Sequence, residues 1–128
     1  MNIIQHNPEQ LYPRYKNFSH AIEVKSGTRQ LFISGLNGYL QDGKTMPESF
    51  AEQGEIVWKY LGILLKEANM DYKNLVSIRT YLAKPEYDNE NVALRVKYLG
   101  DHAPSLTVIC CQLLDPKWKI ELEAIAAE

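Results

Sequence analysis

The chain has 128 residues, of which 45% are hydrophobic and 23% are charged; this is the size and balance of one globular domain and excludes intrinsic disorder. Fourteen Lys and Arg residues against sixteen Asp and Glu residues leave a formal net charge of −2, so the basic surplus typical of nucleic-acid-binding proteins is missing. The apolar runs are too short to cross a bilayer of about 30 Å. Residues Met1 to Asn7 show no apolar stretch behind positive charges, so we expect no signal peptide and a cytoplasmic location.

Two cysteines, Cys110 and Cys111, are adjacent in the sequence. On a strand, their side chains would point to opposite faces, and a disulfide between them would require a strained turn. We therefore expect two small, reduced residues in the core of a cytoplasmic protein.

The first third of the chain has a β-like pattern, from Ala21 to Val24 and again from Arg29 to Leu36. The intervening residues Lys25 to Thr28 predict a hairpin loop, in which Gly27 is free to adopt a positive φ. A polar loop is expected from Asn37 to Pro47.

A helix is predicted next. Ser49 and Glu52 have the spacing of a capping box, and apolar side chains then recur at helical spacing at Phe50, Val57, Leu61, Leu64 and Ala68. The pattern predicts a helix from Phe50 to Ala68, with Asn69 as its C-terminal cap.

The second half alternates strands and a helix. Leu75–Leu82 is predicted to be a strand with Val76, Ile78, Thr80 and Leu82 on one face and Ser77, Arg79 and Tyr81 on the other. Pro85 ends it, a helix follows from Asp88 to Gly100, and strands Leu106–Leu113 and Lys119–Ala126 flank the Asp115-Pro116 turn. The whole chain, 1–128, therefore reads as one α+β domain in the order β-β-α-β-α-β-β, a mixed sheet with two helices on one face.

The strand Leu106–Leu113 is apolar on both faces, as expected of a strand buried on both sides. Two helices cover only one face of the sheet, and no further element remains for the other. Because an exposed apolar sheet favours aggregation, self-association is the economical way to cover it.

Short motifs in a characteristic order run through the chain. They are Phe18-Ser19-His20-Ala21, Leu31-Phe32-Ile33-Ser34-Gly35, Gln53, Ser77-Ile78-Arg79-Thr80-Tyr81-Leu82, Asn91 and Ile120-Glu121-Leu122-Glu123-Ala124-Ile125-Ala126. Together these motifs resemble the Rid family (YjgF/YER057c/UK114), and the last of them is the most specific.

The resemblance implies a chorismate-mutase-like fold, assembled as a homotrimer with a central barrel and a cleft between each pair of neighbouring subunits. It implies a small-molecule ligand, because well-studied members hydrolyse reactive imines and enamines to keto acids and ammonia. No metal and no organic cofactor is implied. An older label for the family, endoribonuclease or translation inhibitor, fits poorly, since phosphate contacts need Lys and Arg; we expect no nucleic-acid partner and no membrane partner.

The family's carboxylate-binding arginine, in a Pro-Ala-Arg-Ser-like motif, is replaced here. The matching residues read Pro104-Ser105-Leu106-Thr107, which places Leu106 on that arginine. Because loss of a buried charge partner typically costs about 2–5 kcal/mol, we expect little hydrolysis of 2-iminopropionate, provided that Leu106 faces the same cleft as Glu121. A non-catalytic binding or regulatory protein of the same fold is the alternative.

Glu121 matches the pocket glutamate of the family. An imine carbon is already electrophilic, so its hydrolysis needs a cation for the substrate carboxylate and a positioned water, and Glu121 is the catalytic candidate for orienting that water. Glu121 and Glu123 share one strand face, however, and an intersubunit salt bridge with Arg79 is the alternative role.

Eight further residues are candidates for ligand binding. They match pocket positions of the family or lie beside them: Phe18, Ser34, Gly35, Arg79, Tyr81, Asn91, Leu106 and Val108. Arg79 either replaces the missing cation or pairs with a strand carboxylate, Gly35 either approaches a ligand or allows close strand packing, and Tyr81 either supplies a hydroxyl or packs at the subunit seam. The three histidines lack metal-ligand spacing, so we expect no metal site.

Overall fold

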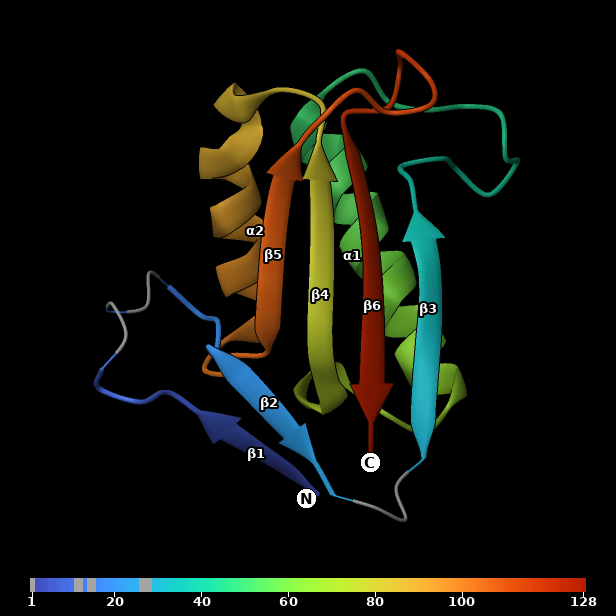
Figure 1. The fold of residues 1–128 in the computed structure, drawn as a ribbon. Coiled ribbons are helices and arrows are strands. Elements are labelled where there is room, and N and C mark those ends of the chain that lie inside the picture. Colours follow the sequence, from blue (N-terminus) through green and yellow to red (C-terminus); the bar gives the residue numbers. More distant parts are fainter. Residues whose placement is uncertain (1, 11–12, 14–15, 26–28) are drawn as a thin grey trace.

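A four-stranded mixed sheet backed by two helices forms the body of the protein. The computed structural model describes residues 2–10, 13, 16–25 and 29–128. The strand order is β3 (Gln30–Leu36), β6 (Ile120–Ala127), β4 (Leu75–Leu82) and β5 (Ser105–Cys110). Within this sheet β4 and β5 run parallel, and the pairs β3–β6 and β4–β6 are antiparallel. The helices α1 (Phe50–Glu67) and α2 (Asp88–Leu99) both lie behind one face of the sheet, as predicted (Figure 1).

The N-terminal strands form a separate hairpin, which corrects the prediction for this region. β1 (Ile3–His6) pairs antiparallel with β2 (Ala21–Val24), whereas β3 pairs with β6. The expected hairpin between β2 and β3 is therefore wrong, and its glycine, Gly27, lies outside the described residues. The sequence reading missed β1, so the observed order has one strand more than predicted. β3 finds its partner across the sheet because its apolar side chains complete the core there.

The hairpin is anchored to the N-terminal end of β5. Ser19 forms a parallel bridge with Ser105, and its N–H donates to the Pro104 carbonyl at 2.7 Å. The Ser19 hydroxyl also donates to the Ala103 carbonyl, which in turn accepts a bond from Gln5 Nε2 at 3.2 Å. This contact brings the segment around residue 18 next to the edge strand.

The first helix begins at its predicted cap, Ser49, but it ends at Glu67, with Ala68 as the C-terminal cap one residue before the predicted Asn69. The Ser49 hydroxyl accepts the Glu52 N–H at 3.1 Å, and Asn69 follows the last turn in a left-handed conformation with φ of 59°. The buried stripe differs in part from the predicted one, because Leu64 is 39% exposed while Trp58 and Leu65 are buried. The stripe advances in steps of four along 57, 61 and 65, so position 64 falls at its margin.

The second helix lies where it is predicted, but of its apolar positions Val96 is 43% exposed, whereas Leu94 and Leu99 are buried. A short 3₁₀ turn, η2 (Pro85–Tyr87), leads into α2, and Gly100 ends the helix with φ of 57°. A similar turn, η1 (Tyr72–Asn74), precedes β4. Among the described residues, no helix is long and apolar enough to cross a membrane.

β5 is shorter and more exposed than predicted. It ends at Cys110 because its partner β4 ends at Leu82, whose carbonyl accepts the last bond from the Cys111 N–H. It is an edge strand, and Ile109 is 45% exposed. Burial on both faces is thus wrong for the single chain, and so is the expected core position of the cysteines, since Cys110 is exposed and Cys111 is half-buried.

The core lies between the sheet and the helices. Its most completely buried members come from both layers: Val57, Leu61, Leu65, Leu75, Ile78, Ile120 and Leu122. Between the two helices, the Trp58 ring stacks on the Tyr98 ring with centroids 5.4 Å apart. Burial of these side chains on one face only fixes the direction in which every other strand residue points.

Gln53 connects α1 to two loops, one that follows β3 and one that follows β5. Its fully buried side chain donates from Nε2 to the carbonyls of Pro47 and Lys117, at 2.8 and 3.0 Å, and accepts the Lys119 N–H at 2.9 Å. A side chain at Gly38 would overlap it, because a Cβ there would lie 2.7 Å from the Gln53 Cβ. One side chain therefore holds the segments that precede α1 and β6.

We expect Gln53→Met to lower the free energy of unfolding by about 2–5 kcal/mol, because three backbone groups lose their partner on a fully buried amide. Urea denaturation at fixed protein concentration measures the change. Gln41→Met, the same substitution in the exposed loop after β3, is the matched control and should change stability by less than about 0.5 kcal/mol. Equal effects of the two substitutions would contradict this role of Gln53.

Candidate functional site

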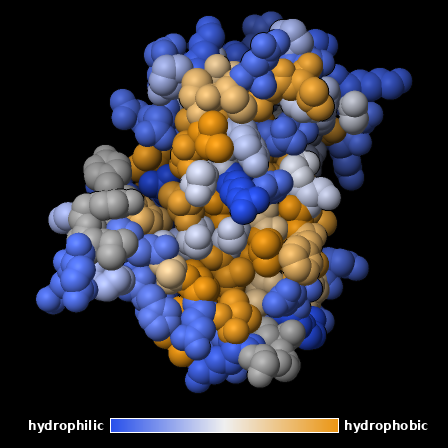
Figure 2. Space-filling model, in the orientation of Figure 1, coloured by the Kyte–Doolittle hydropathy of each residue, from blue (hydrophilic) through white to orange (hydrophobic). Residues whose placement is uncertain are grey.

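The face of the sheet that the helices leave uncovered carries the acidic residues of β6. In the β4–β6 register, Glu121 lies opposite Tyr81 and Glu123 lies opposite Arg79. Apolar side chains share this face, including Phe32, which is 69% exposed. Figure 2 views this face and shows a hydrophilic cluster with hydrophobic surface on both sides of it. Charged and apolar side chains therefore lie together on this exposed face.

Glu121 lies directly against Gly35. A Cβ at Gly35 would overlap the Glu121 carboxylate, and the β3–β6 register shifts between Ile33 and Leu36, around this glycine. In the single chain Gly35 allows close packing, and the group packed against it is the candidate catalytic carboxylate. Burial, followed by the charge of Glu123, raises the pKa of Glu121 above its usual range.

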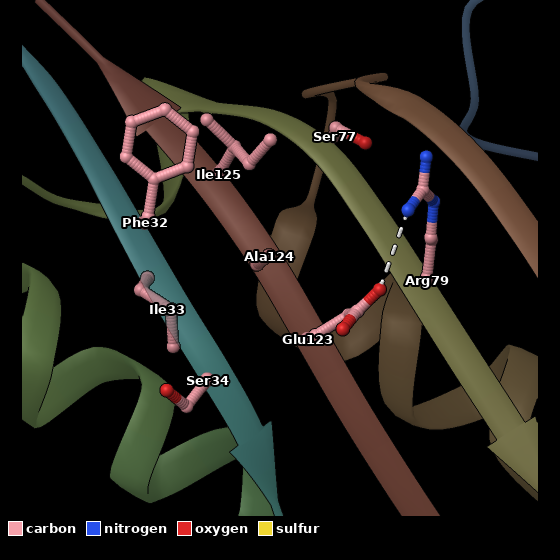
Figure 3. Close-up of a pocket in the computed structure, with 8 residues that line it drawn as sticks. All are labelled: Phe32, Ile33, Ser34, Ser77, Arg79, Glu123, Ala124 and Ile125. Atoms are coloured by element: carbon pink, nitrogen blue, oxygen red, sulfur yellow. Dashed lines mark hydrogen bonds and ion pairs between the residues drawn. The ribbon is translucent and has the colours of Figure 1, made fainter.

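Arg79 pairs with Glu123 rather than with Glu121. Its Nη1 lies 3.5 Å from Glu123 Oε1, and the Tyr81 hydroxyl donates to the same oxygen at 3.1 Å. The hydrogen bond to Glu123 is the main reason that the pKa of Tyr81 is raised. Figure 3 shows the Arg79 and Glu123 side chains reaching toward each other from β4 and β6. In the single chain, Arg79 therefore forms an ion pair with a strand carboxylate.

Two shallow cavities lie on this uncovered face. One, of about 260 Å³, is bordered by Ser34 and the Arg79–Glu123 pair (Figure 3). The other, of about 530 Å³, is bordered by Tyr81, Glu121 and the segment 111–114. Ser34, Gly35, Tyr81 and Glu121, predicted separately from the sequence, are thus brought to one face.

A third cavity lies on the opposite side of the sheet, between α2 and the edge strand β5. We call it the α2–β5 pocket; it has a volume of about 410 Å³ and is lined by Phe18, Leu82, Pro85, Asp88, Val92, Arg95, Leu106, Val108 and Cys110. Leu106 pairs with Ile78, whose side chain is buried toward the helices. Three predicted ligand-binding residues, Phe18, Leu106 and Val108, therefore line one pocket.

Within one chain, Leu106 and Glu121 do not face the same cleft. The expected loss of 2-iminopropionate hydrolysis required that they do, so within a single chain this requirement is not met. Side chains alternate along strands, and the β4 residues opposite them, Ile78 and Tyr81, point to opposite faces. The same alternation separates the cysteines as predicted, with Cys110 in the α2–β5 pocket and Cys111 beside Glu121.

Asn91 lies on α2 next to this pocket but does not line it. Its side chain is buried, and Nδ2 donates to Asp88 Oδ1 at 3.5 Å. Asn91 therefore contacts the pocket indirectly, through its hydrogen bond to Asp88, which does line the pocket.

The sequence reading missed Arg95, the one cation among the described residues that line the α2–β5 pocket. The residue is only 4% exposed. Its spacing gave a signal, because Asp88, Val92 and Arg95 are four and then three residues apart and therefore share one face of a helix. In the described part of the chain, no group of three or more His, Cys, Asp or Glu residues is arranged to hold a metal.

Comparison with known proteins gives a consistent result. A family model described as Endoribonuclease L-PSP matches residues 10–128. The crystal structure of YyfB, a Rid protein of unknown function from Yersinia pestis, is 30% identical, covers 100% of both chains and has a TM-score of 0.89. Protein HMF1 of Saccharomyces cerevisiae is 28% identical over 112 residues, which are 88% of this chain and 84% of that protein.

A third relative carries a functional name. Reactive Intermediate Deaminase A, chloroplastic, of Arabidopsis thaliana is 31% identical over 111 residues, which are 85% of this chain and 57% of that protein. The match of the family model to nearly the whole chain, together with the shared sheet and helix layers, shows that this protein belongs to the Rid family (YjgF/YER057c/UK114; Endoribonuclease L-PSP).

Proposed function

We propose that the protein is a homotrimer that binds a small molecule in clefts between subunits. The observation that carries this proposal is the division of the candidate residues between two faces of the sheet. Glu121, Gly35 and Ser34 lie on the uncovered face, whereas Phe18, Leu106 and Val108 line the α2–β5 pocket. A single cleft that contains both groups requires two copies of the chain.

The uncovered sheet face supports the same assembly. Phe32, Ile109 and the Arg79–Glu123 pair are exposed there in the single chain. Packing three such faces around a central barrel would bury this apolar surface and bring Glu121 of one subunit toward the α2–β5 pocket of the next. The family resemblance likewise implies a homotrimer.

The reaction that we propose for this cleft is hydrolysis of an imine or enamine. Glu121 would orient a water for attack on the electrophilic carbon, and the raised pKa of its carboxyl suits a group that accepts a proton from that water and returns one to the leaving nitrogen. The named deaminase among the relatives supports this reaction class. The chemistry proposed here uses protein groups and water.

One observation favours a second function, that of a non-catalytic binding or regulatory protein. Leu106 occupies the position of the family's arginine and presents an apolar side chain to the α2–β5 pocket. In that case the trimer and its cleft would persist without hydrolysis. The expected absence of nucleic-acid binding and the cytoplasmic location remain predictions; one relative is named as mitochondrial and another as chloroplastic.

We expect the protein in solution to have three times the subunit mass of 14.7 kDa, about 44 kDa. Phe32→Asp should dissociate the trimer by placing a charge in each interface, whereas Ile63→Asp should not, because Ile63 is 63% exposed on the outer side of α1. Light scattering after size-exclusion chromatography measures the mass. A wild-type monomer at micromolar concentration would refute the trimer.

We expect Glu121→Gln to slow hydrolysis of 2-imino acids by about 100-fold, because the variant keeps the shape of the side chain and loses proton transfer. The decay of imines generated by an amino-acid oxidase, followed by absorbance, gives the rate. Glu67→Gln is the matched control, since it removes an exposed carboxylate at the end of α1, and its rate should stay close to that of the wild type. If the wild type leaves imine decay unchanged, the non-catalytic function is the correct one.

The raised pKa of Glu121 also predicts a pH dependence of stability. Between the ordinary pKa of 4.5 and the raised pKa, the folded protein binds more protons than the unfolded chain, so the free energy of unfolding falls as pH rises through that window. Glu121→Gln should remove this contribution and be relatively more stable above the window than below it. Urea denaturation from pH 4 to pH 8 tests this, with the exposed substitution Glu86→Gln as control. A pH profile of Glu121→Gln identical to that of the wild type would contradict the prediction.

A further inference from the structure

The two carboxylates on the uncovered face of the sheet have different surroundings. Glu123 accepts the Tyr81 hydroxyl at 3.1 Å, and its Oε1 also lies 3.5 Å from Arg79 Nη1 (Figure 3). Within the described part of the chain, Glu121 receives no hydrogen bond. The donors on this face therefore serve the carboxylate beside the candidate catalytic group and not that group itself.

The direction of the Tyr81 side chain shows how this division arises. In the register of β4 and β6, Tyr81 lies directly opposite Glu121, whereas Arg79 lies opposite Glu123. The Tyr81 hydroxyl nevertheless donates to Glu123, its diagonal neighbour. The hydroxyl that is closest in register to Glu121 is thus engaged elsewhere, and the Glu121 carboxylate remains available to a water or a ligand.

The surroundings of Glu121 disfavour its charged form. A side chain at Gly35 would overlap the Glu121 carboxylate, so the backbone of β3 confines that carboxylate from one side. Glu123 lies two residues along the same strand face, at about 7 Å. Burial first, and then the charge of Glu123, raise the pKa of Glu121.

Other polar groups near Glu121 do not take over the part of Glu123. Lys119 precedes Glu121 by two residues, but its ammonium donates to the Glu48 carbonyl. The segment after β5 contributes Cys111, which borders the same cavity as Glu121. The nearby polar side chain of β3 is the uncharged Ser34. The neighbouring carboxylate and its two donors therefore remain as the groups that act on Glu121.

We propose that Glu123, held by Arg79 and Tyr81, is a positioning residue for Glu121. Its charge keeps Glu121 able to take up a proton, and its bond to Tyr81 keeps a competing donor away from the Glu121 carboxylate. The inference rests on the hydrolysis proposed above and assigns to Glu123 the control of the proton that Glu121 exchanges. Two carboxylates in different surroundings can in this way take different roles in acid–base chemistry.

Titration of the intact protein, followed by the NMR signals of ¹³C-labelled glutamate carboxyl groups, tests the inference without requiring hydrolysis. The signal of Glu121 is the one that disappears in Glu121→Gln. Glu123→Gln should lower the midpoint of the Glu121 titration by about half a pH unit, the size expected for charges about 7 Å apart at a partly exposed site. Glu67→Gln removes an exposed carboxylate at the end of α1; it is the matched control and should leave the midpoint unchanged.

Further variants separate the charge of Glu123 from its bond to Tyr81. Glu123→Asp retains a carboxylate and should keep most of the wild-type midpoint. In Glu123→Gln the acceptor becomes a neutral amide, which holds the Tyr81 hydroxyl less strongly, so the hydroxyl is free to turn to Glu121 and stabilise its charge. Combining Glu123→Gln with Tyr81→Phe should therefore restore part of the lost midpoint. If Glu123→Gln fails to fold, Arg79→Met replaces it, and loss of this cation should raise the Glu121 midpoint.

The pH dependence of kcat for imine hydrolysis gives a second readout. Glu121 must be ionised to accept a proton from water, so activity falls on the acid side as Glu121 becomes protonated. In Glu123→Gln this acid limb should move to lower pH by about half a unit, with KM changed by less than about twofold. A merely structural role of Glu123 would lower kcat at every pH and leave the limb in place.

The inference is overturned if Glu123→Gln folds and Glu121 titrates as in the wild type, or if Glu67→Gln shifts the midpoint equally. An unchanged midpoint in Arg79→Met would overturn it as well. Absence of imine hydrolysis by the wild type is a separate result, because it refutes the proposed reaction, while the NMR titration still decides whether Glu123 controls the proton on Glu121.

Discussion

The alternation of side chains along β6 is the constraint on which the rest of the structure depends. Ile120, Leu122 and Ala124 point into the core, and Glu121 and Glu123 point to the uncovered face. β6 lies between β3 and β4, so a shift of one residue would place two carboxylates in the core and break both pairings. The register is therefore fixed, and with it the position of Glu121 opposite Tyr81 and against Gly35.

The same alternation separates the two groups of candidate site residues. The α2–β5 pocket, with Arg95 and Leu106, lies on the helix side of the sheet, and Glu121 lies on the other. A ligand held by the first group and a water held by the second would therefore meet only where two subunits adjoin. The proposed site therefore includes quaternary structure, because a side chain on one face of a closely packed sheet cannot reach the other face.

The conformation of the two loops that follow β3 and β5 depends on a different interaction. Gln53 ties α1 to the segments that carry Pro47 and Lys117, and the latter segment leads into β6. The residues 111–114 that border Glu121 belong to the same connection. A buried amide with three satisfied bonds gives such a connection one conformation, because any rearrangement would leave backbone groups without partners.

Both helices, the alternation within β4 and the layer arrangement were determined by the sequence alone, since capping by Ser49, the turn at Gly100 and apolar periodicity act over a few residues. The family motifs likewise singled out Glu121 and Gly35, which the structure brings together. Only the tertiary structure decided that β2 pairs with β1, that β5 is an edge strand, and that Arg95, not Arg79, lies beside Leu106. Strand partners and the shared walls of a pocket are set by contacts between distant parts of the chain, for which local patterns carry no direct signal.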